Sequence, residues 1–258
     1  IYFGDQGHVP YGPRPMEQIQ CFSEGITQFL LDQKAKLMVV ACNTASAAAL
    51  KYLRDKFPDI SFVGMEPAIK PAAEHTATGV VGVLATPATF QGALYASVVE
   101  RFGANVELLQ STCPGLVQQI EHGDLDGKST RKILEDALFP MLDKNIDTVV
   151  LGCTHYPFVI PLIQQIVGGK VRVIDPAPSV ARQAKRLLEA QGMLNPSEAR
   201  GDIRFFTSGD ASTPMQSMLP MLLGENGTVE PVAWKSDKEI KGSCRCEEGA
   251  LPDEASPS

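Results

Sequence analysis

Two stretches of the sequence share a design in which an apolar run ends at a cysteine. At residues 37–46, Leu-Met-Val-Val-Ala precedes Cys42 and Asn-Thr follows it; at residues 148–157, Thr-Val-Val-Leu-Gly precedes Cys153 and Thr-His-Tyr-Pro follows it. The apolar runs are typical of buried strands, and the polar residues that follow are typical of helix caps. We expect both thiols at the carboxyl ends of parallel strands, where open α/β sheets form their binding crevices.

A matched pair of thiols at one site suggests a reaction that needs two bases. Inverting a carbon that carries a hydrogen requires one group to remove a proton and another to deliver a proton to the opposite face. A free thiol has a pKa of about 8.5, and a helix N-terminus or a nearby cation lowers it, so one thiol and one thiolate can coexist near neutral pH. The helix starts expected after Cys42 and Cys153 provide that environment and offer N–H groups to a carboxylate. Each cysteine taken alone also fits a small core residue.

The elements that must position these residues alternate between strand and helix, which predicts an α/β fold with mainly parallel sheets flanked by helices. The apolar patterns predict strands at 1–4, 37–42, 60–64, 80–85, 105–109, 147–152, 171–175 and 203–207. They predict helices at about 15–33, 44–57, 89–102, 114–122, 130–144, 157–167 and 178–193, and a last helix that ends at about 223. Small residues at the start of the second helix, Ala45 to Ala49, permit close approach of another backbone or a ligand.

Two proline-rich interruptions, at residues 66–71 and 175–178, predict crossings between two pseudo-symmetric lobes. We expect residues 1–66 plus 177–223 in the first lobe and residues 67–176 in the second, with the active site in the cleft between them. The stretch from 71 to 79 is expected to be turn-rich. Gly, Glu, Lys, Pro and Ser dominate residues 224–258, so we expect a disordered tail there.

Composition narrows the class of protein. The 258-residue chain contains 44% hydrophobic residues, which is enough to form a complete hydrophobic core. It has 23 basic and 30 acidic side chains, and the basic ones do not cluster. This argues against direct nucleic-acid or membrane binding, and no apolar run approaches the roughly 20 residues of a membrane span. We expect a cytoplasmic protein with reduced thiols, no cofactor and no metal. Cys244 and Cys246 have the spacing of two metal ligands, but no second Cys or His pair lies near them in the sequence.

Four motifs in order carry a family resemblance. These are Phe3-Gly-Asp5 with Pro10-Tyr-Gly12, Ala41-Cys-Asn-Thr-Ala-Ser46, Ala85-Thr-Pro-Ala-Thr89 and Leu151-Gly-Cys-Thr-His-Tyr-Pro157. The chain resembles bacterial glutamate racemases, cofactor-independent isomerases of the aspartate/glutamate racemase superfamily, from Ile1 to about Thr213. The resemblance implies interconversion of L- and D-glutamate for peptidoglycan and cell-wall biogenesis. Aspartate or hydantoin racemase is the alternative within the superfamily.

The resemblance also implies roles for individual residues. Cys42 would act on the D-enantiomer and Cys153 on the L-enantiomer, with His155 and Glu121 assisting the thiols. The implied substrate contacts are Tyr11, Gly12, Asn43, Thr44, Thr86, Thr89, Thr154 and His155. Judged from the residues alone, His155 also fits a helix cap or packing residue, and Glu121 also fits a solvated helix end.

One departure from the family concerns the segment before Ile1. The family begins with a strand and an Asp-Ser-Gly loop at that place, so we expect this sequence to be a piece of a longer protein, and Asp5 is not expected to replace that loop. The resemblance further implies a homodimer and, for some members, a contact with DNA gyrase. Two other classes stay open: a catalytically impaired racemase-fold binding protein, and a redox or zinc protein that uses Cys42, Cys153 and His155.

Overall fold

The computed structural model describes residues 1–197, 199, 201–209, 215–216, 219–220, 224 and 227–241. The strands are β1 (Tyr2–Gly4), β2 (Leu37–Val39), β3 (Ser61–Val63), β4 (Val80–Ala85), β5 (Glu107–Ser111), β6 (Thr148–Gly152), β7 (Arg172–Ile174), β8 (Phe205–Thr207), β9 (Val229–Pro231), β10 (Ala233–Ser236) and β11 (Glu239–Lys241). The helices are α1 (Met16–Asp32), α2 (Asn43–Lys56), α3 (Ile69–His75), α4 (Pro87–Gln91), α5 (Ala93–Phe102), α6 (Leu116–Glu121), α7 (Lys128–Leu142), α8 (Ile160–Val167) and α9 (Ala177–Ala190). Short 3-10 helices are η1 (Gln6–His8) and η2 (Tyr156–Val159).

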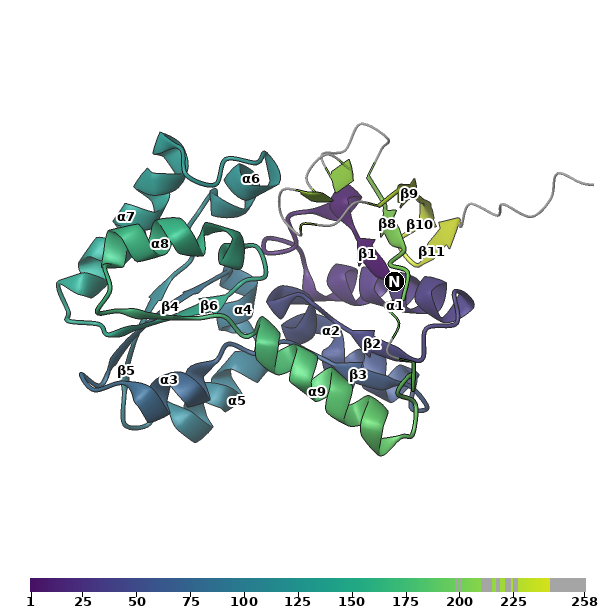
Figure 1. Cartoon of the computed structure of the whole chain (residues 1–258), viewed down its shortest axis with the longest axis horizontal. Coiled ribbons are helices and arrows are strands. Elements are labelled where there is room, and N and C mark those ends of the chain that lie inside the picture. The colour runs from purple at the N-terminus through teal and green to yellow at the C-terminus, as the bar shows by residue number, and fades with distance from the viewer. Residues whose placement is uncertain are drawn as a thin grey trace, which may run out of the picture.

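The middle of the chain forms a parallel sheet with strand order β5-β4-β6-β7. Residues of α6, α7 and α8 share one hydrophobic core with this sheet, and residues of α3 and α5 share a second core with it. Figure 1 shows these two helix groups above and below the sheet on the left of the molecule. Every residue of β6 is buried. A strand covered on both faces reads as a continuous apolar run, which is why the strand before Cys153 was recognisable.

The remainder of the chain, on the right in Figure 1, contains parallel sheets of order β1-β8-β9 and β2-β3. Helix α1 packs against α2, and α9 packs against β2 and β3. A core of Met38, Ala49, Leu50, Leu53 and Phe62 joins β2 and β3 to α2. The predicted α/β fold with parallel sheets flanked by helices is therefore confirmed. The lobe boundaries and the cleft between the lobes stay predictions.

The predicted tail is wrong for residues 227–241, which contain β9, β10 and β11. Strand β9 extends the β1-β8 sheet in parallel, and β10 and β11 form an antiparallel hairpin. The reason is local burial: Val232, with Ile240 packed alongside, joins Phe29 and Phe206 in a small core. Burial of these few side chains within a polar stretch stabilises the strands although the average composition predicts none. Residues 242–258, with Cys244 and Cys246, lie outside the described residues.

Two details of the predicted helices are also wrong. Helix α3 occupies part of the stretch expected to be turn-rich, because Pro71 lies in the first turn of the helix, where proline is tolerated. The single helix expected at 89–102 is interrupted at Gly92, whose backbone is extended. A Cβ on Gly92 would lie 2.7 Å from the Cβ of Ala47, so α2 approaches this break closely, as its small residues predict. In the region of the last predicted helix, before residue 223, the described residues 215–216 and 219–220 are helical.

None of the helices that the structure describes has both the length and the apolar composition that crossing a bilayer requires.

Candidate active site

Cys42 lies at the N-cap of α2, three residues after β2 ends. Its extended backbone directs the side chain toward the first turn of the helix, where its sulfur accepts a hydrogen bond from the N–H of Ala45 at 3.4 Å. Burial raises the pKa of the Cys42 thiol, whereas hydrogen bonds from Ala45 and Thr44 lower it, and the net direction is upward. This end therefore favours the protonated thiol while retaining N–H groups that can stabilise a thiolate.

The residues after Cys42 form a polar wall. Asn43 is only 2% exposed, and its side-chain Oδ1 and Nδ2 have no hydrogen-bond partner among the described residues. The Thr44 hydroxyl lies 2.7 Å from that of Thr86, which caps α4 and lies 3.0 Å from the hydroxyl of Thr89. An unpaired buried amide costs about 1–3 kcal/mol. A polar ligand that pairs with Asn43 would remove this cost, so the Asn43 amide marks a place for such a ligand.

Cys153 follows β6 directly, is 8% exposed, and has a side-chain partner instead of a helix N-terminus. Its sulfur lies 3.8 Å from Nδ1 of His155, and Nε2 of His155 lies 2.6 Å from Oε1 of Glu121. Burial opposes protonation of His155, but its contacts with Cys153 and Glu121 raise its pKa to about 9. The same contact holds the pKa of Glu121 below its usual range, despite burial. An imidazolium–carboxylate pair therefore stands beside the Cys153 sulfur.

The contacts of His155 and Glu121 differ from those of a helix cap and of a solvated helix end. His155 precedes η2 without making a side-chain cap, and Glu121 at the end of α6 directs its carboxylate to His155 instead of to solvent. The geometry therefore brings Cys153, His155 and Glu121 together in one line of contacts. Thr154 lies between Cys153 and His155 and is half-buried.

Two residues of the first strand and the loop after it lie near the groups beside the thiols. Gln6 places its Nε2 3.4 Å from Oε2 of Glu121 and accepts a hydrogen bond from the Thr207 hydroxyl at 3.0 Å. Although 47% of Tyr2 is exposed, burial of its hydroxyl end and the negative charges of Glu121 and Cys42 raise its pKa. Tyr2 and Gln6 were missed in the sequence, where each resembles an ordinary residue of a strand and loop.

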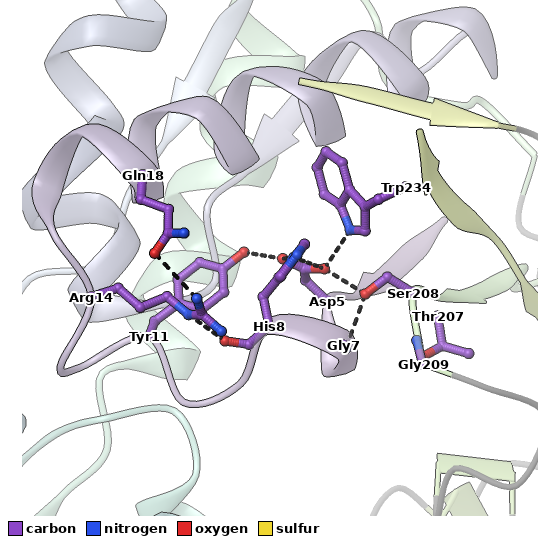
Figure 2. A network of polar contacts seen from close by, with 10 residues as sticks. All are labelled: Asp5, Gly7, His8, Tyr11, Arg14, Gln18, Thr207, Ser208, Gly209 and Trp234. Atoms are coloured by element: carbon purple, nitrogen blue, oxygen red, sulfur yellow. Dashed lines mark hydrogen bonds and ion pairs between the residues drawn. The ribbon is translucent and has the colours of Figure 1, made fainter. Parts of the chain in front are cut away.

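The loop after β1 carries the other two predicted ligand contacts. The Tyr11 hydroxyl donates to the Asp5 carboxylate (Figure 2), and burial, Asp5 and Cys42 together raise the pKa of Tyr11. A Cβ on Gly12 would lie 3.3 Å from the Cβ of Thr86, so only glycine fits there without displacing that threonine. The loop therefore lies against Thr86, and the ligand contacts of Tyr11 and Gly12 stay predictions.

A metal centre is not formed by these residues. Across the part of the chain that the structure describes, no three His, Cys, Asp or Glu side chains are arranged to hold a metal ion, so Cys42, Cys153 and His155 do not form such a group.

Comparison with known proteins places the chain in a family. The model of the family described as Asp/Glu/Hydantoin racemase matches residues 1–184. The chain belongs to the Asp/Glu/hydantoin racemase family. A racemase of this family from Ectopseudomonas mendocina, named glutamate racemase, is 46% identical over 229 residues, which cover 89% of this chain and 86% of the relative.

Solved racemase structures have the same fold. Escherichia coli glutamate racemase, in complex with L-glutamate and the activator UDP-MurNAc-ala, has a TM-score of 0.77 and 31% identity, covering 93% of this chain and 88% of that one. Francisella tularensis glutamate racemase, in complex with D-glutamate, has a TM-score of 0.76 and 30% identity, covering 90% of this chain and 86% of that one.

Proposed function

We propose that this racemase is a glutamate racemase that interconverts L- and D-glutamate and supplies D-glutamate for peptidoglycan synthesis. The 46% identity to the Ectopseudomonas mendocina enzyme and the likeness to structures that hold L- and D-glutamate support this substrate. Aspartate or hydantoin as substrate, the alternative within the family, has no comparable support.

The observation that carries the mechanism is that both thiols follow a strand, Cys42 at a helix N-terminus and Cys153 beside the His155–Glu121 ion pair. With L-glutamate bound, the Cys153 thiolate removes the α-proton, and the C–H electron pair moves into the α-carboxylate group to give an enolate-like carbanion. The Cys42 thiol then returns its own proton to the opposite face of the α-carbon, which yields D-glutamate and a Cys42 thiolate. The reverse sequence converts D-glutamate into L-glutamate.

The starting state of the forward reaction matches the electrostatics of the site. Burial raises the pKa of the Cys42 thiol, and the His155 imidazolium lies 3.8 Å from the Cys153 sulfur. In the reverse direction Cys42 must be the thiolate, and the N–H groups at the start of α2 stabilise it. Glu121 keeps His155 protonated and oriented, so its role is to position and charge that imidazole.

The remaining predicted residues are proposed to bind the substrate. The unpaired amide of Asn43 can accept from the substrate ammonium and donate to a carboxylate, and the hydroxyls of Thr44, Thr86, Thr89 and Thr154 add further donors. Gly12 lies against Thr86, and Tyr11 precedes it, so both are proposed to contact the substrate beside these hydroxyls. The scheme uses only protein side chains and requires no cofactor.

The test is a polarimetric or circular dichroism assay of the purified protein with L-glutamate, without added pyridoxal phosphate, flavin or metal. We expect the signal to decay to zero, and the same end point from D-glutamate. L-aspartate and a 5-substituted hydantoin serve as matched substrates. Faster decay with either of them, or a glutamate signal that stays constant, would overturn the assignment and favour the alternative racemase or the impaired binding protein. The homodimer, the gyrase contact and the cytoplasmic location stay predictions.

A further inference from the structure

The Asp5 carboxylate gathers hydrogen bonds from three separate parts of the chain. Its side chain is only 6% exposed and contacts Nδ1 of His8 at 3.0 Å. It also accepts from the Tyr11 hydroxyl, from the Ser208 hydroxyl after β8, and from the indole N–H of Trp234 in β10 at 2.9 Å. Figure 2 shows these donors arranged around Asp5. A carboxylate held from several sides has no freedom to rotate, so the donors also fix one another through it.

Trp234 is itself held by close packing against α1. Its ring centroid lies 5.6 Å from that of Phe22 and 5.2 Å from that of His8, and His8 stacks on Phe22 at 3.8 Å. A Cβ on Gly25 would lie 2.7 Å from the Trp234 ring and 2.8 Å from the Lys238 carbonyl oxygen. The β10–β11 hairpin therefore seats directly on the backbone of α1, and the position of the indole N–H is fixed by that seating.

We infer that Trp234 is a positioning residue for glutamate binding, because it orients Asp5, which in turn orients Tyr11 at the Cys42 end of the site. This inference rests on the proposed function. Tyr11 precedes Gly12, which lies against Thr86, and the charge of Cys42 raises the pKa of Tyr11. A shift of the Tyr11 ring would therefore displace Gly12 and Thr86, which are proposed to contact the substrate. Trp234 exerts this effect from a position 229 residues away from Asp5 in the sequence.

The discriminating variant is Trp234→Phe, which keeps an aromatic ring on α1 and removes only the N–H donor. We expect KM for both glutamate enantiomers to rise about 3- to 10-fold while kcat stays within about twofold, because the reacting thiols are untouched. The melting temperature should change by less than about 2 °C. Lys238→Gln is the matched control: it removes the hairpin's ion pair with Glu24, at 3.5 Å, without touching Asp5, and should leave KM unchanged.

A double-mutant cycle with Tyr11→Phe tests the link itself. If Trp234 acts through Asp5 on Tyr11, the KM increase of the double variant should be clearly smaller than the product of the two single increases. A KM increase in the double variant that equals the product of the two single increases would overturn the inference. An unchanged KM in Trp234→Phe would also overturn it. A wild-type protein that does not racemise glutamate would instead overturn the proposed function, so the two failures are distinguishable.

Discussion

The Cys42 end and the Cys153 end are built on the same strand-to-helix design but hold their sulfurs by different means. Cys42 receives backbone N–H groups at the start of a 14-residue helix, α2, and burial raises its pKa. Cys153 precedes only a 3-10 helix, and its partner is the His155 side chain, which Glu121 keeps charged. One end depends on fixed backbone dipoles, and the other depends on a titratable ion pair.

This difference shows that two thiols at similar strand ends can have different electrostatic surroundings. Side-chain substitutions can alter the charge at the Cys153 end, whereas the N–H groups at the Cys42 end are not removed by changing a neighbouring side chain. The equilibrium constant of a racemisation is one, so kcat/KM must remain equal for the two enantiomers in every variant. An asymmetry between the ends is therefore invisible in kcat/KM but can be detected in partial reactions and in stability.

The largest expected effect comes from removing either thiol. Serine has a similar shape but far weaker acidity, so Cys42→Ser and Cys153→Ser should each lower the racemisation kcat by about 10²- to 10⁴-fold. The rate is measured by circular dichroism from both enantiomers. Cys21→Ser, a change on α1 outside the candidate site, is the control and should keep its activity. Either active-site variant retaining more than a tenth of the activity would contradict the two-base mechanism.

A smaller effect is expected from the ion pair beside Cys153. His155→Asn removes the cation next to the sulfur and should lower kcat by about 10- to 100-fold, below the full effect of losing an acid/base group. Glu121→Gln leaves the imidazole in place but removes its counter-charge, so its loss should be smaller. His75→Asn, at an exposed position of α3, is the matched control. A Glu121→Gln loss that exceeds the His155→Asn loss would show that His155 is not the group acting on the thiol.

The smallest effect is the pH dependence of stability that the pair imposes. The pKa of His155 rises from 6.5 to about 9 on folding, so the proton binds more tightly to the folded state than to the unfolded state. This contribution is complete below about pH 6.5 and is lost as the pH rises through 9. The melting temperature of wild type should exceed that of His155→Asn by more at pH 6 than at pH 10. Equal differences at the two values would mean that the ion pair does not form.

The positions of the strands were predictable because most strands are short apolar runs bounded by turn residues, and the strand-end positions of the two thiols followed from the same pattern. Helix α3 was missed because Pro67 and Pro71 indicate a turn, and the break at Gly92 depends on contact with Ala47, which no local pattern records. The hairpin was missed because a few buried side chains, Val232 among them, stabilise it within a polar stretch.

The site was predictable to a similar degree. The cysteines and the polar residues beside them are visible in the sequence, but the contact between His155 and Glu121 joins residues 34 positions apart, and only the family resemblance suggested it. The Asp5 cluster joins segments more than 200 positions apart. Such contacts arise from tertiary packing, so no spacing rule could reveal them.

The most direct test of the central claim is exchange of the α-hydrogen of each glutamate enantiomer in deuterated water by the two cysteine variants. A remaining thiolate can remove the α-proton, exchange it with solvent and return deuterium to the same face. We predict that Cys42→Ser exchanges L-glutamate but not D-glutamate, and that Cys153→Ser exchanges D-glutamate but not L-glutamate. Mass spectrometry of the recovered enantiomers measures both reactions. Equal loss of exchange for both enantiomers in both variants would mean that the cysteines shape the pocket without transferring protons.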